Sequence, residues 1–145
     1  MIPKTLANLT ATIGTVTELL SPLSDRVTKI SILCHEVNRL HDHLISSPTP
    51  SNTWSLTPDN IKASARAGVQ SHLADPGKTP EQSHQEWLNY KEAEGWVYGP
   101  VKDIEKKQHP CMVPYDQLPA DMKTKDYLFK ASVSLGSTLF QDVSA

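Results

Sequence analysis

The sequence predicts a small, mainly helical protein with a short β-hairpin, and three observations support this fold class. Hydrophobic side chains follow a helical period through the first third of the chain, and capping residues, prolines and glycines mark further helices. Between residues 96 and 114, prolines, a glycine and short aromatic or β-branched stretches replace that period. With 145 residues, the chain has enough material for one modest core.

Apolar residues recur at alternating spacings of three and four along residues 4–45, and only His41 breaks the series. This spacing is the heptad pattern of helices that pack along a continuous seam. Because Pro22 cannot continue a regular helix, we expect two helices, over residues 4–20 and 24–45. Either both helices pack on the core of their own domain, or the first helix pairs with a copy of itself; the spacing favours neither. The series consists of Leu6, Leu9, Ile13, Val16, Leu20, Leu23, Val27, Ile30, Cys34, Val37 and Leu44.

Residues 46–55 have the composition of a linker, rich in serine, threonine and proline. Trp54 within this segment predicts that the loop lies against the core. A third helix follows, with Thr57 as its cap and Pro58 at its first position, and it extends to about Leu73.

The next helix begins with a capping box between Thr79 and Gln82 and ends at Gly95. Residues 96–114 are expected to form the hairpin and ordered loops. A last helix is predicted over residues 119–135.

Composition excludes several classes of function. With a net charge of −2, the protein lacks the excess of basic residues that sequence-independent binding of nucleic acid requires. The two cysteines, Cys34 and Cys111, lie far apart and form no disulfide framework, which favours a reducing compartment. Neither a signal peptide nor an apolar run long enough to span a bilayer is recognisable. We therefore expect a cytoplasmic protein, in the host cytoplasm if the protein is viral, with no membrane partner.

The sequence lacks the patterns that common catalytic chemistries need. Residues 35–39 resemble the opening of a zinc-protease helix, but Arg39 occupies the position of the second histidine. The six histidines form no recognised ligand set, no glycine-rich phosphate loop is present, and neither cysteine is flanked by a positioned base. The expectation is a protein without catalytic residues, metal or cofactor.

Aromatic and cationic residues concentrate between positions 84 and 115. His84, Trp87 and Lys91 are three and four residues apart, so they share one helix face. Flat aromatic surface beside ammonium groups suits a ligand that carries a base and phosphates. The same aromatic residues could instead build the core, and composition alone favours that alternative. The following segment adds Trp96, Tyr98, Lys102, Lys106, Lys107, His109 and Tyr115.

These residues resemble the RyR domain, a repeat first described in ryanodine receptors and also found alone in bacteriophage and bacterial proteins. Three upstream features, residues 34–39, the Gly68-Val69 pair and His72, are similar to the bacteriophage versions. The resemblance predicts a RyR-like domain over residues 27–140, with its core motif at 84–126. Residues 1–26 fall outside it, and their heptad pattern predicts an N-terminal helical extension that could serve oligomerisation. The segments that carry the resemblance are His84 to Trp87, Lys91, Glu94 to Asp103, Lys106 to Pro119 and Lys125-Asp126.

The resemblance implies a helical module whose His-x-x-Trp helix faces a ligand, with Trp87 at the position that stacks on an adenine-type base. Receptors carry such modules in tandem, so a second chain could complete the site here. The implied function is non-catalytic binding of a nucleotide-derived molecule of the ADP-ribose type, as in a bacteriophage sponge for a host immune signal. The heptad pattern separately predicts a homo-oligomer. The alternative is a structural protein that assembles through its N-terminal helix. The candidate ligand-binding residues are His35, Arg39, His84, Trp87, Lys91, Trp96, Tyr98, Lys102, His109 and Tyr115.

Overall fold

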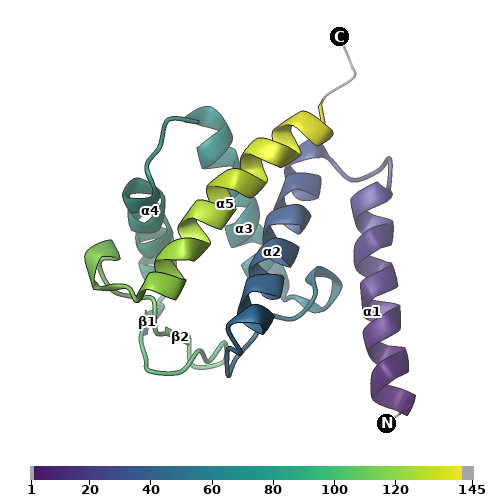
Figure 1. Ribbon diagram of the computed structural model, residues 1–145, viewed down its shortest axis with the longest axis horizontal. Coiled ribbons are helices and arrows are strands. Elements are labelled where there is room, and N and C mark those ends of the chain that lie inside the picture. Colours follow the sequence, from purple (N-terminus) through teal and green to yellow (C-terminus); the bar gives the residue numbers. More distant parts are fainter. Residues whose placement is uncertain (1, 142–145) are drawn as a thin grey trace.

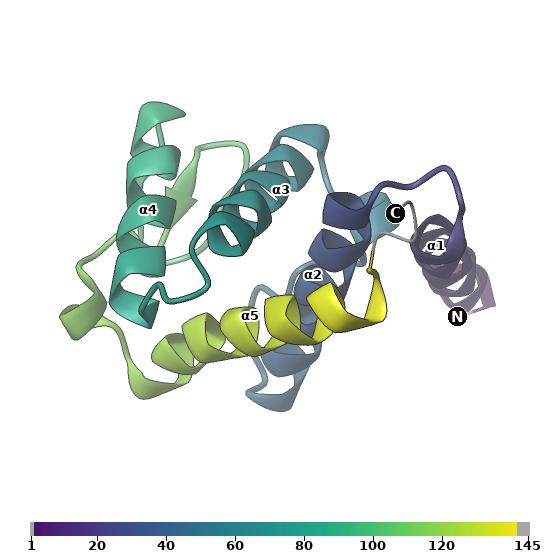
Figure 2. The same cartoon turned by 90° about the horizontal axis from the view of Figure 1, so that it is seen from above.

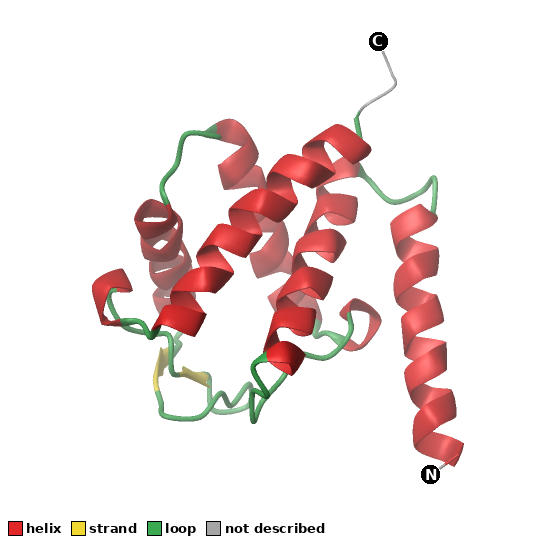
Figure 3. Cartoon of the chain, viewed as in Figure 1, coloured by secondary structure: helices red, strands yellow, loops and turns green. Residues whose placement is uncertain are grey.

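The computed structural model describes residues 2–141 and is dominated by helices, as predicted (Figures 1 and 3). Within this range, five α-helices surround the core, and one pair of two-residue strands lies at one end of the bundle. The elements are α1 (Ile2–Leu20), α2 (Arg26–Leu44), α3 (Asp59–Ala74), α4 (Pro80–Ala93), β1 (Val97–Tyr98), β2 (Gln108–His109) and α5 (Ala120–Leu139), with short 3-10 turns η1 (Trp54–Leu56) and η2 (Tyr115–Gln117).

Local capping signals set most helix ends. The predicted capping box of α4 is present, because Gln82 N–H donates to the Thr79 hydroxyl and Thr79 N–H donates to the Gln82 side chain. Thr57, in contrast, does not cap α3. Pro58 occupies that position, and the Thr57 hydroxyl instead donates to the carbonyl oxygen of Thr53 over 3.1 Å.

The predicted strand pair is present, but it is parallel and therefore not a hairpin. Val97 aligns with Gln108 and Tyr98 with His109. The intervening chain reverses direction twice, and its second reversal is closed by two 2.9 Å backbone hydrogen bonds between Asp103 and Gln108. A Cβ atom on Gly99 would lie only 2.7 Å from Gln108 Cβ, so the close approach of these segments needs a glycine.

The hydrophobic core lies between α2, α3 and α5. Its buried centre consists of Ile30, Cys34, Val69 and Val133, and Phe129 packs against it. The two long helices α2 and α5 lie side by side, with α3 and α4 behind them in the view of Figure 1. This packing places one side of α3, one side of α4 and the first half of α5 around a common space.

Trp54 is fully buried, so the segment 46–55 does lie against the core as its tryptophan predicted.

Helix α1 stands at the edge of the bundle, beside α2 and η1 (Figures 1 and 2). Among residues 6–20, the buried side chains are the small Ala11 and Thr15. The heptad positions of α1 lie on the opposite face, since an α-helix has about 3.6 residues per turn. The domain core covers the heptad seam from Val27 to Val37, whereas the α1 part of the seam, Leu23 and Leu44 are exposed to solvent. The exposed heptad side chains of α1, 46–70 % accessible, are Leu6, Leu9, Ile13, Val16 and Leu20.

Candidate functional site

A cavity of about 1010 Å³ opens between α2, α3, α4, α5 and the loops around residues 47–52 and 100–105. A second pocket of about 490 Å³, at Arg26 and Arg66, contains none of the predicted site residues. The large cavity is therefore the candidate site. Its lining includes the predicted residues His35, His84, Trp87, Lys91, Trp96, Lys102 and His109.

The aromatic wall of the cavity is built on one face of α4. Trp87 is half-buried and stacks on His84, with ring centroids 5.5 Å apart and 26° between the ring planes. The edge of His109 lies against the same tryptophan, 5.1 Å between centroids. Trp96 is 3 % exposed and belongs to the core of this region. Thus Trp87 is the tryptophan that offers accessible ring surface to the cavity.

Two lysines enter the cavity beside this wall. Lys91 is only 5 % exposed, and its ammonium lies over the ring of Trp96. The Lys102 ammonium has a long, 3.4 Å hydrogen bond to the hydroxyl of Ser51. Burial lowers the pKa of both lysines. No carboxylate in residues 2–141 forms an ion pair with either ammonium.

Two ring N–H groups add donors at the same end. The backbone N–H of Cys111 donates to His109 Nδ1 over 3.0 Å, so this nitrogen is an acceptor. Burial lowers the pKa of His109 to about 3, and the neutral ring therefore carries its proton on Nε2. The indole N–H of Trp96 is buried without a hydrogen-bond partner among the described residues. The polar groups gathered here are donors, which suits a ligand rich in acceptor oxygens.

The carboxylate of Asp42, which also lines the cavity, is already engaged. One of its oxygens lies 2.5 Å from Lys125 Nζ, and the other accepts the backbone N–H of Ser51 over 3.0 Å. Burial raises the pKa of Asp42, but the hydrogen bonds from Lys125 and Ser51 outweigh it, so the pKa lies below its usual range. Because Asp42 and Lys125 pair with each other, this carboxylate forms no ion pair with Lys91 or Lys102 in the described structure. Asp42 and Lys125 meet only in the tertiary structure; the RyR-like motif includes Lys125, and no sequence pattern pointed to Asp42.

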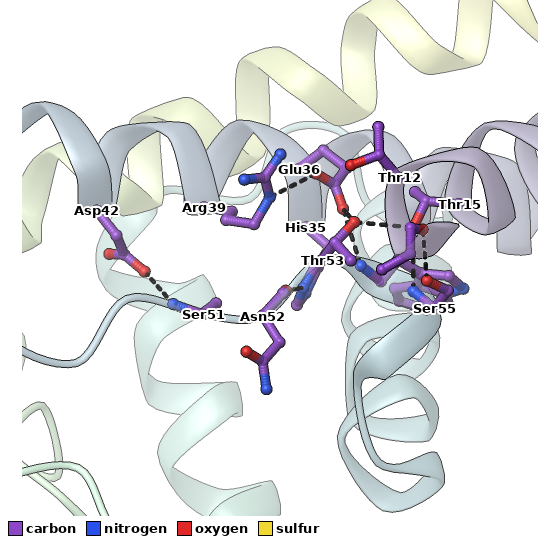
Figure 4. Close-up of polar contacts among 12 residues, drawn as sticks. Thr12, Thr15, His35, Glu36, Arg39, Asp42, Ser51, Asn52, Thr53 and Ser55 are labelled. Atoms are coloured by element: carbon purple, nitrogen blue, oxygen red, sulfur yellow. Dashed lines mark hydrogen bonds and ion pairs between the residues drawn. The ribbon is translucent and has the colours of Figure 1, made fainter. Parts of the chain in front are cut away.

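The loop of residues 47–52 forms another wall of the cavity, and hydrogen bonds fix residues 51–55 to α2 and α1 (Figure 4). His35 Nε2 donates to the carbonyl oxygen of Asn52 over 2.6 Å. Glu36 accepts from the Thr53 hydroxyl over 2.9 Å and from the Trp54 N–H over 2.8 Å. These contacts make His35 and Glu36 supports of the cavity wall.

The remaining predicted residues lie outside the cavity lining. Arg39 pairs with Glu36, 2.7 Å from Nε to the carboxylate, and so holds that side chain in place (Figure 4). Tyr98 is exposed on β1, and Tyr115 in η2 contacts the edge of His84. The structure thus brings His84, Trp87 and Lys91 together in the cavity, as their spacing predicted. Arg39, Tyr98 and Tyr115 do not join them there.

Sequence reasoning did not single out Asp126, which also lines the cavity. Its Oδ2 atom is buried without a hydrogen-bond partner in the described structure, 3.9 Å from His84 Nδ1. Burial, with the charge of Glu81, raises the pKa of Asp126 to about 7. The Lys125-Asp126 dipeptide was visible in the RyR-like motif, and that was the one sequence signal that pointed to it.

Two further properties concern the part of the chain that the structure covers. No group of three or more His, Cys, Asp or Glu side chains there is arranged to hold a metal ion. None of the described helices combines the length and apolar character needed to cross a membrane.

Comparison with protein families gives a match to the RyR domain over residues 69–139. The match begins in the last turns of α3 and extends through α4, both strands and α5. It therefore contains Trp87, Lys91, Trp96, Lys102, His109 and Asp126, while α1 and α2 lie before it. The similarity to bacteriophage versions upstream of residue 69 stays a prediction. By the match across the cavity-forming helices, the chain is a RyR-domain protein.

Proposed function

We propose that this protein binds a nucleotide-derived small molecule of the ADP-ribose type in the cavity and leaves it chemically unchanged. The observation that carries the proposal is the set of donors at one end of the cavity, next to the accessible ring of Trp87. Lys91 and Lys102 supply the charge, and Trp96 and His109 supply ring N–H groups.

An anionic ligand matches the electrostatics of this end. A buried ammonium without a counter-ion is costly, and a phosphate supplies both the opposite charge and acceptor oxygens. The diphosphate of ADP-ribose therefore fits beside Lys91 and Lys102. A base stacked on Trp87 contributes about 1–3 kcal/mol more.

Binding without reaction is supported by the state of the nucleophilic side chains. Burial raises the pKa of the Cys34 thiol to about 12 and that of the Cys111 thiol to about 11. Both thiols are therefore protonated, and a thiol is a much weaker nucleophile than a thiolate. His109 uses Nδ1 to accept the Cys111 N–H and so does not offer that atom as a base.

Such a protein lowers the free concentration of its ligand in proportion to its own abundance. In a bacteriophage, this activity would act as a sponge for a host immune signal.

The test is calorimetric titration of the full chain with ADP-ribose, followed by denaturation and mass spectrometry of the released ligand. We expect saturable binding, weakening as salt rises, and release of intact ADP-ribose. Lys91→Met keeps the apolar stem and removes the charge, and it should weaken binding roughly tenfold or more. The control is Lys106→Met, at an exposed lysine between β1 and β2. Affinity that ignores both salt and Lys91→Met would contradict the proposed phosphate site, and an altered ligand would contradict binding without reaction.

A second candidate function is assembly. The exposed apolar face of α1 favours it, because five large side chains at heptad spacing lie in solvent on the face turned away from the domain. A homo-oligomer joined through α1 would cover them. This function is compatible with ligand binding and needs no small molecule.

A further inference from the structure

The cavity has a second polar end, formed by Asp126 of α5 and His84 of α4, where the first halves of these helices meet (Figure 2). His84 Nε2 lies 2.8 Å from the carbonyl oxygen of Val113, which can only accept, so the ring proton is on Nε2. Burial lowers the pKa of His84 and keeps the ring neutral. Nδ1 is therefore a hydrogen-bond acceptor.

This acceptor faces another acceptor. Asp126 Oδ2 lies 3.9 Å from His84 Nδ1, too far for a direct hydrogen bond, and this oxygen is buried without a partner among the described residues. Lys125, the neighbouring cation, is engaged with Asp42 on the other side of α5. Above its pKa of about 7, Asp126 is a carboxylate, and two acceptors then stand next to each other with no donor between them among the described residues. A buried acceptor without a donor is costly, so the pair is suited to a ligand that brings donors.

The position of this pair along α4 indicates which part of a ligand it meets. His84 and Lys91 are seven residues apart on one face of the helix, which corresponds to roughly 10 Å along its axis. Trp87 lies between them. The site therefore has acceptors at one end, an aromatic ring in the middle and donors with positive charge at the other end. A nucleotide has the same polarity when its base carries an amine: amine, planar ring, then phosphate.

We propose that Asp126 and His84 accept the two N–H groups of an exocyclic amine on the planar base that stacks on Trp87. A primary amine attached to a ring has two N–H donors in one plane, which matches two acceptors. A ribose hydroxyl has a single donor and satisfies only one of them. The site thereby selects adenine over hypoxanthine, because hypoxanthine presents a carbonyl oxygen, a third acceptor, at this point. This inference rests on the proposed nucleotide binding and assigns its base specificity.

The test compares ADP-ribose with inosine diphosphate ribose, which differs only in having a carbonyl where adenine has its amine. Both are titrated into the full chain at pH 8, above the pKa of about 7 of Asp126, so that a protonated carboxyl cannot donate to the carbonyl. We expect ADP-ribose to bind roughly tenfold to a hundredfold more tightly. In Asp126→Asn, whose amide can donate as well as accept, this ratio should fall close to one. The control Asp116→Asn removes an exposed carboxylate in η2 and should keep the ratio.

The outcomes separate this inference from the proposed function. Equal affinity of the wild-type protein for the two compounds, together with weakening by Lys91→Met, would overturn amine recognition and leave nucleotide binding in place. An unchanged ratio in a folded Asp126→Asn variant would also overturn it, since the discrimination would then arise elsewhere. If neither compound binds, both proposals fail. The wild-type ratio alone decides the matter if Asp126→Asn does not fold.

Discussion

The ammonium group of Lys91 lies 4.9 Å from the centre of the Trp96 ring, and both side chains are almost completely buried. Both tryptophans line the cavity, but Trp96 is almost completely buried, whereas Trp87 on α4 keeps part of its ring accessible. The two tryptophans, nine positions apart in sequence, therefore have different roles in the proposed site.

Substitution of the two tryptophans should separate stability from binding. Trp96→Ala removes a core side chain and should lower the free energy of unfolding by about 3–5 kcal/mol. Trp87→Ala should cost clearly less stability and weaken ADP-ribose binding by about 1–3 kcal/mol, the energy of stacking one base. Thermal melting and calorimetry on both variants provide the measurement. A collapsed melting temperature for Trp87→Ala would return this residue to the core and remove the stacking surface from the proposal.

Removal of the Lys125 charge should destabilise the fold. Lys125→Met leaves the Asp42 carboxylate, whose side chain is 3 % exposed, without its cation, and unpaired buried charges are costly. We expect a loss of roughly 3–5 kcal/mol in urea unfolding near neutral pH. Lys123→Met, two positions earlier on α5, is the matched control and should change the stability little. Because protonation neutralises Asp42, the deficit should shrink as the pH falls, and a deficit independent of pH would contradict this account.

The raised pKa of Asp126 predicts a pH-dependent difference between the wild-type protein and Asp126→Asn. The folded carboxyl keeps its proton up to about pH 7, whereas the unfolded carboxyl loses it near its ordinary value of 3.8. Between these values the folded state binds the extra proton, so this group makes the wild-type protein less stable as the pH rises. The asparagine variant lacks this loss.

The difference in free energy of unfolding, variant minus wild type, should therefore increase from about pH 4 to about pH 7 and then level off. Urea unfolding at pH 5 and pH 8 measures it. Histidines with lowered pKa values, such as His109, act in the opposite direction but are present in both proteins and cancel in the difference. A difference that is constant with pH would show that the Asp126 pKa is not raised by burial.

The exposed face of α1 predicts association. Each leucine or valine that becomes fully buried contributes roughly 1.5–3 kcal/mol, so five such side chains supply a sizeable driving force. We expect light scattering at micromolar concentration to give a mass above that of one chain, and the double variant Leu9→Glu/Ile13→Glu to give a monomer. Thr12→Glu, also exposed on α1 but outside the heptad positions, should leave the mass unchanged. A wild-type monomer would contradict assembly through this face.

Local sequence signals predicted the helices well because their causes are local. The capping box at Thr79 and Gln82, the break at Pro22 and the face shared by His84, Trp87 and Lys91 all depend on residues within a few positions of one another. The direction of the strand pair was predicted wrongly, because it does not depend on local signals. Two short strands separated by a turn resemble a hairpin, but their direction depends on the double reversal of the chain between Gly99 and Gln108.

The polar ends of the cavity could be predicted only in part, because they combine residues of one helix with contacts between distant segments. Lys91 and Trp87 belong to one helix, so their proximity follows from spacing. The neutrality of His109, the engagement of Asp42 and the unpaired oxygen of Asp126 each depend on contacts between distant segments. Arg39 became a candidate through the RyR-like resemblance of residues 34–39, and its ion pair with the Glu36 carboxylate three positions earlier became visible only in the structure.

Helix α1 is seated on the domain by hydroxyl groups rather than by an apolar seam. The hydroxyls of Thr15 and Thr53 lie 2.8 Å apart, and Ser55 donates from its hydroxyl to the Ala11 carbonyl oxygen over 2.6 Å (Figure 4). Thr53 and Ser55 belong to the same five-residue segment that Lys102 and His35 reach from the cavity side.

Segment 51–55 thus lies between the cavity and helix α1 and contacts both. A change in this segment that altered both ligand binding and association through α1 would link the two reciprocally. With such linkage, the dissociation constant for the ligand would become a function of protein concentration. A binding isotherm recorded at a single protein concentration would then describe a mixture of coupled and uncoupled sites.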